Sequence, residues 1–354
     1  MALTRRGKIV ASIGAALALV AVGGIALALT GHAPAPIQRA VDALTGEEHT
    51  KPPPTCPLTG LPAPGGEVPH SPVVAVKVEN TPDAYPLAGL QHADVVYEEI
   101  VEGGITRFMA LYQCKDAANV GPVRSARTTD PKILVQFSDG SILAYSGGQS
   151  AVVNAIGRSG LVSLDETAGG AAFWRDPERV APHDLLVNTF KLRAKVAKRI
   201  AGERAPRRVF PFDAEATVPG KHVVSVTAAF SSSITATWRW MPDAGRWQRR
   251  YEDAPMTLDT GRAITATNVL IQQVEVTEGN LVDVLGYHSP EVTVTGSGKA
   301  WILRDGVLIK GRWIRPVMGA VTKFLTKSGE MIPLMPGNTW VELIPTTETV
   351  TFTH

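Results

Sequence analysis

Charged side chains concentrate between Asp94 and Arg127, among several tight turns. The acids there are Asp94, Glu98, Glu99, Glu102 and Asp116, and the bases are Arg107, Lys115, Arg124 and Arg127. Paired carboxylates about 5 to 9.5 Å apart can hydrolyse a glycosidic bond. On an extended strand, Glu98 and Glu102 share a face but lie about 13 Å apart, at about 3.3 Å per residue. The spacing therefore argues against hydrolysis unless the chain bends at the glycine pair 103–104.

The three arginines of this segment, Arg107, Arg124 and Arg127, allow two interpretations. Acids and bases nearly balance, which favours an ion-pair network in which each guanidinium fork binds one carboxylate. Alternatively, the turn at Gly121-Pro122 places Ser125 and two arginines together, and exposed backbone N–H groups could join the forks around a phosphate or carboxylate. The first interpretation predicts a structural role, and the second predicts an anion clamp.

A loop between two predicted elements carries Trp174, Arg175, Asp176 and His183. An aromatic ring beside charged groups on a loop is typical of a ligand-binding wall, and a histidine can exchange protons near neutral pH. His183 and Glu102 could then serve a cell-wall polymer hydrolase or transferase. A histidine without a nucleophile or metal set equally fits a structural hydrogen bond. Convergence of Glu102, Arg124, Arg175 and His183 in one open cleft would indicate a site.

Familiar cofactor motifs do not occur in the sequence. There is no nucleophile elbow, zinc-ligand spacing, phosphate-binding P-loop or dinucleotide fingerprint, and the glycines of EGGITRF and YSGGQS lack the register of a phosphate loop. We therefore predict no cofactor and no metal site, and we assign no catalytic residue.

Composition limits the class of protein. A chain of 354 residues that is 44% hydrophobic and 19% charged is long enough for two folded domains. The net charge of +2 includes Arg5, Arg6 and Lys8; without them, 35 − 3 = 32 bases face 33 acids. Nucleic acid is not an expected partner, because binding its phosphates needs a basic excess.

The first 55 residues predict export and anchoring. A basic leader, residues 1–8, precedes residues 9–30, which contain no ionisable side chain and can span a hydrocarbon core of about 30 Å. The leader holds the N-terminus inside, so the body would be extracytoplasmic on a single-pass plasma-membrane anchor. Cleavage after Ala26-Leu27-Ala28, giving a secreted protein, is the alternative. Residues 31–55 are rich in proline and predict a stalk.

The remaining elements predict an α+β protein. Strands are expected at 73–80, 93–101, 107–114 and 141–147, and helices at 130–137, 149–156 and 188–201, which gives a mixed α/β domain over 56–205. A linker at 206–220 leads to 221–354, where short strands and turns predict a mostly antiparallel all-β domain, a barrel or sandwich.

The chain has two cysteines, Cys56 and Cys114. In an oxidising compartment two cysteines more often pair than stay free, so we predict a disulfide between them.

Residues 191–208 form a basic run. We interpret it either as a solvated face or as a contact with anionic headgroups.

Several separated motifs occur in a specific order: CPLTGLP, VAVKVENTPDAYPLAGLQHADVVYEEIVEGGITRFMALYQ, NVGPVRSAR, FWRDPERVAPHDL, GKAWILRDGVLIKGRW and MPGNTWVELIP. This order resembles the YerB-like family of bacterial extracytoplasmic lipoproteins, from about Cys56 to Pro345. The resemblance implies two domains of unknown function and provides no catalytic assignment for residues of this chain. Two departures stand out: the family's lipidated cysteine is missing before Cys56, and Asp184 stands where the family usually has asparagine.

Two function classes remain. One is a non-enzymatic, membrane-anchored binding or scaffold protein of the cell envelope, which contacts a cell-wall synthesis protein, a wall polymer or an anionic wall ligand. The other is a wall-polymer enzyme that uses Glu102 and His183. The missing catalytic signatures favour the first class.

Overall fold

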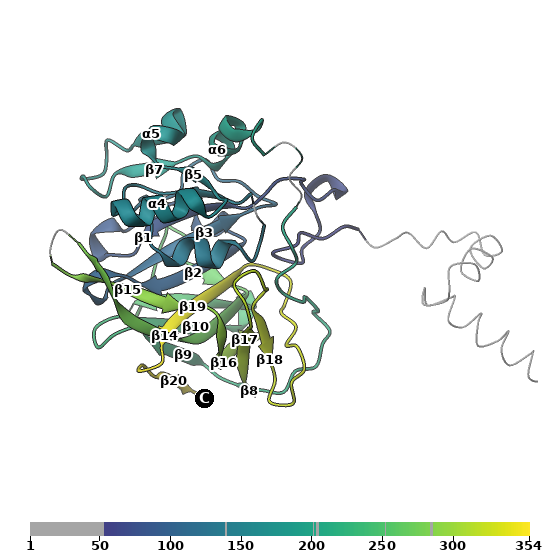
Figure 1. Ribbon diagram of the computed structural model, residues 1–354. Helices are drawn as coiled ribbons and strands as arrows, with labels where there is room; N and C mark the ends of the chain where they lie inside the picture. Colours follow the sequence, from purple (N-terminus) through teal and green to yellow (C-terminus); the bar gives the residue numbers. More distant parts are fainter. Residues whose placement is uncertain (1–52, 139, 201, 203–204, 252, 284–285) are drawn as a thin grey trace, which may run out of the picture. The chain divides into compact units, whose positions relative to one another are not determined.

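A mixed sheet of twelve strands is the centre of the fold in the computed structural model, which describes residues 53–138, 140–200, 202, 205–251, 253–283 and 286–354 (Figure 1). The first half of the chain contributes β1 (Val74–Glu79), β2 (Val95–Ile100), β3 (Thr106–Tyr112), β4 (Ile142–Ala144) and β5 (Val162–Leu164). The second half contributes β8 (Lys221–His222), β14 (Asn268–Val282), β15 (His288–Thr293), β16 (Gly296–Arg304), β17 (Val307–Arg315), β18 (Lys323–Leu325) and β19 (Thr339–Pro345). The main path runs β18-β17-β16-β14-β19-β2-β3-β1-β4-β5.

An antiparallel sheet packs on one face of this large sheet. It consists of β9 (Ser225–Ala229), β10 (Thr235–Met241), β11 (Arg246–Tyr251), β12 (Ala254–Pro255), β13 (Thr265–Ala266) and β20 (Val350–Thr353). Large aromatic side chains fill the space between the sheets: the ring of Trp340 lies 5.2 Å from that of Trp238 and 5.1 Å from that of Phe108. Their burial supplies much of the apolar area that holds the two sheets together.

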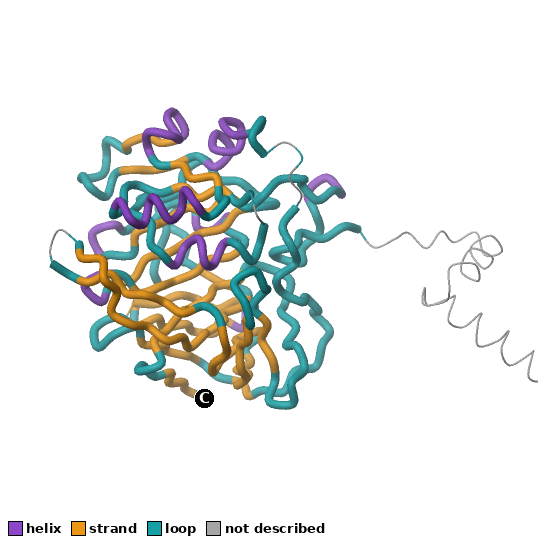
Figure 2. Tube along the Cα trace, viewed as in Figure 1, coloured by secondary structure: helices purple, strands orange, loops and turns teal. Residues whose placement is uncertain are grey.

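Helices and short strands cover the rest of the large sheet, and Figure 2 shows the helices gathered at the end formed by the first half. The covering elements are α3 (Thr129–Leu134), α4 (Ser150–Arg158), α5 (Glu166–Gly169) and α6 (Thr189–Val196), with the hairpin β6 (Phe173–Arg175) and β7 (Leu185–Val187). Apolar side chains of α3 and α4 join one core, and those of α6 and the hairpin join the core on the opposite face. Asn188 caps α6, accepting a bond from Lys191 N at 2.9 Å.

The predicted elements of the first half are confirmed within a few residues, although α6 ends earlier than expected. The second half is mostly antiparallel β, as predicted, but it is not a self-contained barrel or sandwich. Its strand β19 pairs in parallel with β2 of the first half, so one sheet runs through both halves. Residues Pro54–His354 form one compact unit. The predicted domain boundaries at 205 and 221 stay a prediction.

The predicted leader, membrane segment and most of the stalk, residues 1–52, lie outside the described residues. Within the described ranges, no helix is long and apolar enough to cross a membrane.

Candidate functional site

The arginine cluster lies where β1 ends and β3 begins. Arg107 of β3 lies in register opposite Glu79 of β1 on one side and opposite Glu99 of β2 on the other. Opposed residues share a face of a sheet, so these three side chains point toward the same side. Sequence neighbours Glu98 and Glu99 therefore point to opposite faces, because side chains alternate along a strand.

The segment after Gly121 runs along the end of β1 and positions the second arginine. Arg124 N donates to Lys77 O at 2.9 Å, and Glu79 N donates to Pro122 O at 2.9 Å. Gly121 has φ +153°, and a Cβ there would lie 2.8 Å from Leu185 O. Only glycine fits this approach, so the predicted turn brings Arg124 beside Glu79.

Two of the three arginines pair with buried glutamates. Arg127 Nε donates to Glu102 Oε2 at 2.8 Å, and Arg124 Nη2 lies 3.1 Å from Glu79 Oε1. His183 Nδ1 lies 2.8 Å from the other oxygen of Glu79. Sequence analysis did not single out Glu79. Its position two residues beyond Lys77 could have indicated it, because residues two apart on a strand lie on the same face. These pairs match the ion-pair interpretation.

Arg107 differs from the other two arginines. Its Nη1 lies 3.9 Å from Glu102 Oε2 and donates no hydrogen bond to a described residue. Burial first, and then the neighbouring charge of Arg127, lower the pKa of Arg107 to about 10, against the opposing effect of Glu102. The Arg107 side chain is 13% exposed. It is a desolvated cation without a hydrogen-bonded counter-ion, which is the feature expected of an anion site.

A buried ion triad continues the cluster toward α3. Lys77 Nζ contacts Glu99 and lies 2.8 Å from Asp130 Oδ1, and all three side chains are buried. Asp130 also accepts from Arg127 N at 2.6 Å, which joins the triad to the arginine segment. Burial raises the pKa of Glu99 to about 7, and Asp130 adds to this while Lys77 opposes it.

Glu98 belongs to a different cluster, between the two sheets. Arg249 of β11 lies 2.8 Å from Glu98 and 3.4 Å from Glu342 of β19. Trp238 Nε1 donates to Glu342 at 2.8 Å. Burial and the adjacent Glu98 raise the pKa of Glu342 well above its usual value. Sequence analysis missed Arg249 and Glu342, because neither lies near Glu98 in the chain.

The loop residues form a smaller polar group. Arg175 pairs with Asp184 at 2.7 Å and with Glu166 at 3.1 Å, whereas Asp176 pairs with Arg179 at 3.2 Å. Trp174 is 38% exposed. Ser125 is half-buried next to Gly147. Of the loop residues, His183 joins the arginine cluster through Glu79, and Arg175 pairs elsewhere.

The geometry gives Glu102 and His183 separate partners. Burial alone would raise the pKa of Glu102, but Arg127 and a hydrogen bond from Ser289 lower it below its usual value. A carboxyl with a lowered pKa is a poor general acid near neutral pH. Within the described part of the chain, no group of three or more His, Cys, Asp or Glu side chains is arranged to hold a metal ion.

The predicted disulfide is confirmed: Cys56 and Cys114 are bonded, with Cα atoms 6.0 Å apart. Cys114 follows β3, the strand that carries Arg107. The bridge thus ties the start of the described chain to the strand that carries the cluster.

Comparisons with known proteins match both halves of the chain. Residues 58–203 match the model described as the N-terminal domain of the protein of unknown function DUF3048, and residues 226–341 match its C-terminal domain. The chain is 28% identical over 300 residues to the "Putative lipoprotein YerB" of Bacillus subtilis (strain 168), which covers 82% of this chain and 86% of the relative. The crystal structure of the YerB protein from Bacillus subtilis has a similar fold, with a TM-score of 0.72 and 24% identity over 84% of this chain and 99% of that one.

Proposed function

The chain belongs to the DUF3048 family, and from this premise we propose that it is an extracytoplasmic binding protein of the bacterial envelope that holds an anionic group at Arg107. The anion would be a carboxylate or phosphate of a wall polymer or of a cell-wall assembly partner.

One observation supports the proposal: each acid of the cluster has a close basic partner, whereas Arg107 makes only a long contact of 3.9 Å with Glu102. Glu79 binds Arg124 and His183, Glu102 binds Arg127 and Ser289, and Lys77 binds the two remaining acids. Arg107 lies 3.9 Å from Glu102, but its buried Nη1 donates to no described residue. An anion at this nitrogen would complete its hydrogen bonding.

The name of the relative supports an extracytoplasmic, membrane-associated location, since it describes a lipoprotein. In this chain Cys56 is bonded to Cys114 and so is not free to carry a lipid. The apolar segment 9–30 would provide the attachment instead.

The test compares two arginine variants of the full-length protein. Calorimetric titration would use soluble peptidoglycan stem peptides with free carboxylates, and amidated peptides as the control ligand. Arg107→Gln should weaken binding of the free carboxylates by tenfold or more, because a charge-assisted hydrogen bond contributes about 1.5 to 3 kcal/mol. Its free energy of unfolding should change by less than about 1 kcal/mol, since no bonded acid loses its partner.

Arg127→Gln is the matched variant. It removes the bonded partner of Glu102, so it should destabilise the fold far more than Arg107→Gln does. If Arg107→Gln instead destabilises the protein as much as Arg127→Gln and leaves binding unchanged, the cluster is structural and the proposal is wrong.

A further inference from the structure

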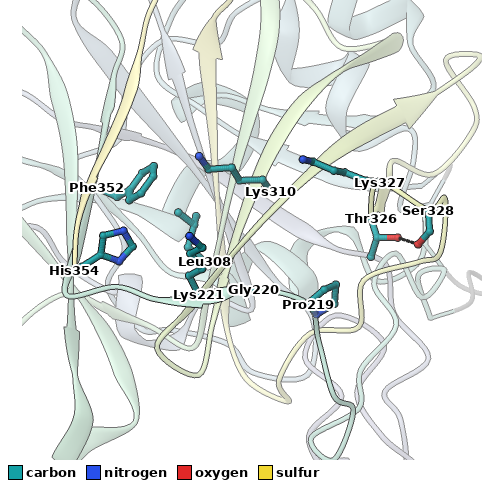
Figure 3. A pocket seen from close by; sticks show the side chains of 10 residues that line it. All are labelled: Pro219, Gly220, Lys221, Leu308, Lys310, Thr326, Lys327, Ser328, Phe352 and His354. Atoms are coloured by element: carbon teal, nitrogen blue, oxygen red, sulfur yellow. Dashed lines mark hydrogen bonds between the residues drawn. The ribbon is translucent and has the colours of Figure 1, made fainter.

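A second feature lies far from Arg107 in the sheet order, at the end formed by β17, β18 and β8. A cavity of about 690 Å³ opens there, next to the edge strand β20 of the smaller sheet. Figure 3 shows Phe352 and His354 on one side and the segment of Thr326 and Ser328 on the other, with Lys310 and Lys327 between them. Lys221 of β8 completes the set of three lysines.

The described residues that line this cavity include no acidic side chain. Among the described residues, no carboxylate oxygen lies within 4.0 Å of the ammonium nitrogens of Lys221, Lys310 or Lys327. The hydroxyls of Thr326 and Ser328 lie 2.7 Å apart, and Ser328 also donates to the exposed Glu330 at 3.2 Å. Lys310 Nζ lies 4.5 Å from the centre of the Phe352 ring. Lys310 thus lies near an aromatic ring, and none of the three lysines forms an ion pair with an acid of the described residues.

Strand register extends the basic surface beyond the cavity. Lys299 of β16 lies directly opposite Arg312 of β17, and both side chains are exposed. Arg312 is two residues from Lys310 and therefore on the same face. Like charges directly opposite each other destabilise a sheet. An anionic ligand over this face would relieve that repulsion.

This concentration of charge is local. The chain as a whole is near balance, with 35 bases and 33 acids. The overall composition therefore does not explain this face, where several lysines and an arginine gather and none pairs with an acid in the part of the chain that the structure describes. Segregated charge of one sign raises the local concentration of ligands of the opposite sign.

We propose that this cavity, the lysine pocket, binds a ligand that carries several phosphate groups. Lysines act as point charges that rotate freely toward separate oxyanions, whereas arginine forks suit one planar anion. A volume of about 690 Å³ exceeds what a single phosphate needs and lies within the range of ligand sites. The phosphates could belong to a soluble polyphosphate or phosphodiester, or to anionic phospholipid headgroups. The pocket does not depend on the anion site proposed at Arg107.

Calorimetric titration of the full-length protein tests the proposal with two probes. Tripolyphosphate represents the soluble source, and vesicles of phosphatidylglycerol, which present many phosphates on one surface, represent the headgroup source, with vesicles of phosphatidylcholine as their neutral counterpart. Binding of tripolyphosphate alone or of both anionic probes supports a site for phosphate itself. Binding of phosphatidylglycerol alone assigns the pocket to lipid headgroups. Binding of neither probe at millimolar concentration overturns the proposal.

Variants distinguish binding at the lysine pocket from a general effect of the protein's net charge. The triple variant K221Q/K310Q/K327Q should weaken binding tenfold or more. Its control, R158Q/R239Q/R262Q, removes three exposed arginines that do not line the cavity and should change binding less than twofold. All six side chains are exposed, so both variants should fold, which thermal melting would verify. Equal losses in the two variants would mean that net charge, not the pocket, binds the probe. Arg107→Gln should leave this binding intact, so failure here is distinguishable from failure of the anion site.

Discussion

The buried carboxyl of Glu99 should make the stability of this protein depend on pH in a defined direction. Burial raises its pKa from 4.5 to about 7, so the folded state holds the proton more tightly than the unfolded state. The resulting stabilisation is fully present below pH 4.5 and is lost as the pH rises through 7. At about 1.4 kcal/mol per pH unit, the full effect is about 3 kcal/mol. Most of it is lost between about pH 5 and pH 8.

Glu99→Gln removes this dependence, because glutamine does not titrate. Urea unfolding at about pH 5 and pH 8 would give the free energy of unfolding of wild type and variant at each pH. The wild-type value minus the variant value should fall by about 2 to 3 kcal/mol from the lower to the higher pH. Asp94 and Glu342 also have raised pKa values, but both are present in wild type and variant and largely cancel in this difference. Glu215→Gln, at an exposed position, controls for the loss of one charge. A difference that is the same at both pH values, or that rises, would refute the reasoning about Glu99.

Two further predictions concern stability. Replacing both Cys56 and Cys114 by serine should lower the free energy of unfolding by about 4 kcal/mol, because the bridge closes a loop with a sequence separation of 58. Dithiothreitol treatment of the wild type should give the same loss in a urea titration. An unchanged urea midpoint would contradict the prediction. Arg249→Ala should lower the free energy of unfolding by about 3 to 5 kcal/mol in the same assay, since it leaves Glu98 buried without its cation. The side chain of Arg250 points to the other face of β11, so Arg250→Ala should lower it by less than about 1 kcal/mol.

Local patterns determined much of the candidate site. The strand that carries Arg107 follows from its apolar residues between glycine-rich turns, and Gly121-Pro122 marks the turn that positions Arg124. Both features act over a few residues, within reach of local propensity. The cysteine pair was equally accessible, since two cysteines allow one intramolecular bridge.

Pairing between strands that are distant in the sequence decided the remaining features of the fold and the site. The sequence by itself determined which segments form strands, which side chains alternate to opposite faces, and that the arginine-rich turns lie among acids. Only the tertiary structure decided that Arg249 reaches Glu98, 151 positions away, that one sheet joins both halves, and that Lys221, Lys310 and Lys327 line one cavity. The physical reason is that strand periodicity is a local property, whereas the choice of neighbouring strands depends on burying the apolar surface of the whole chain.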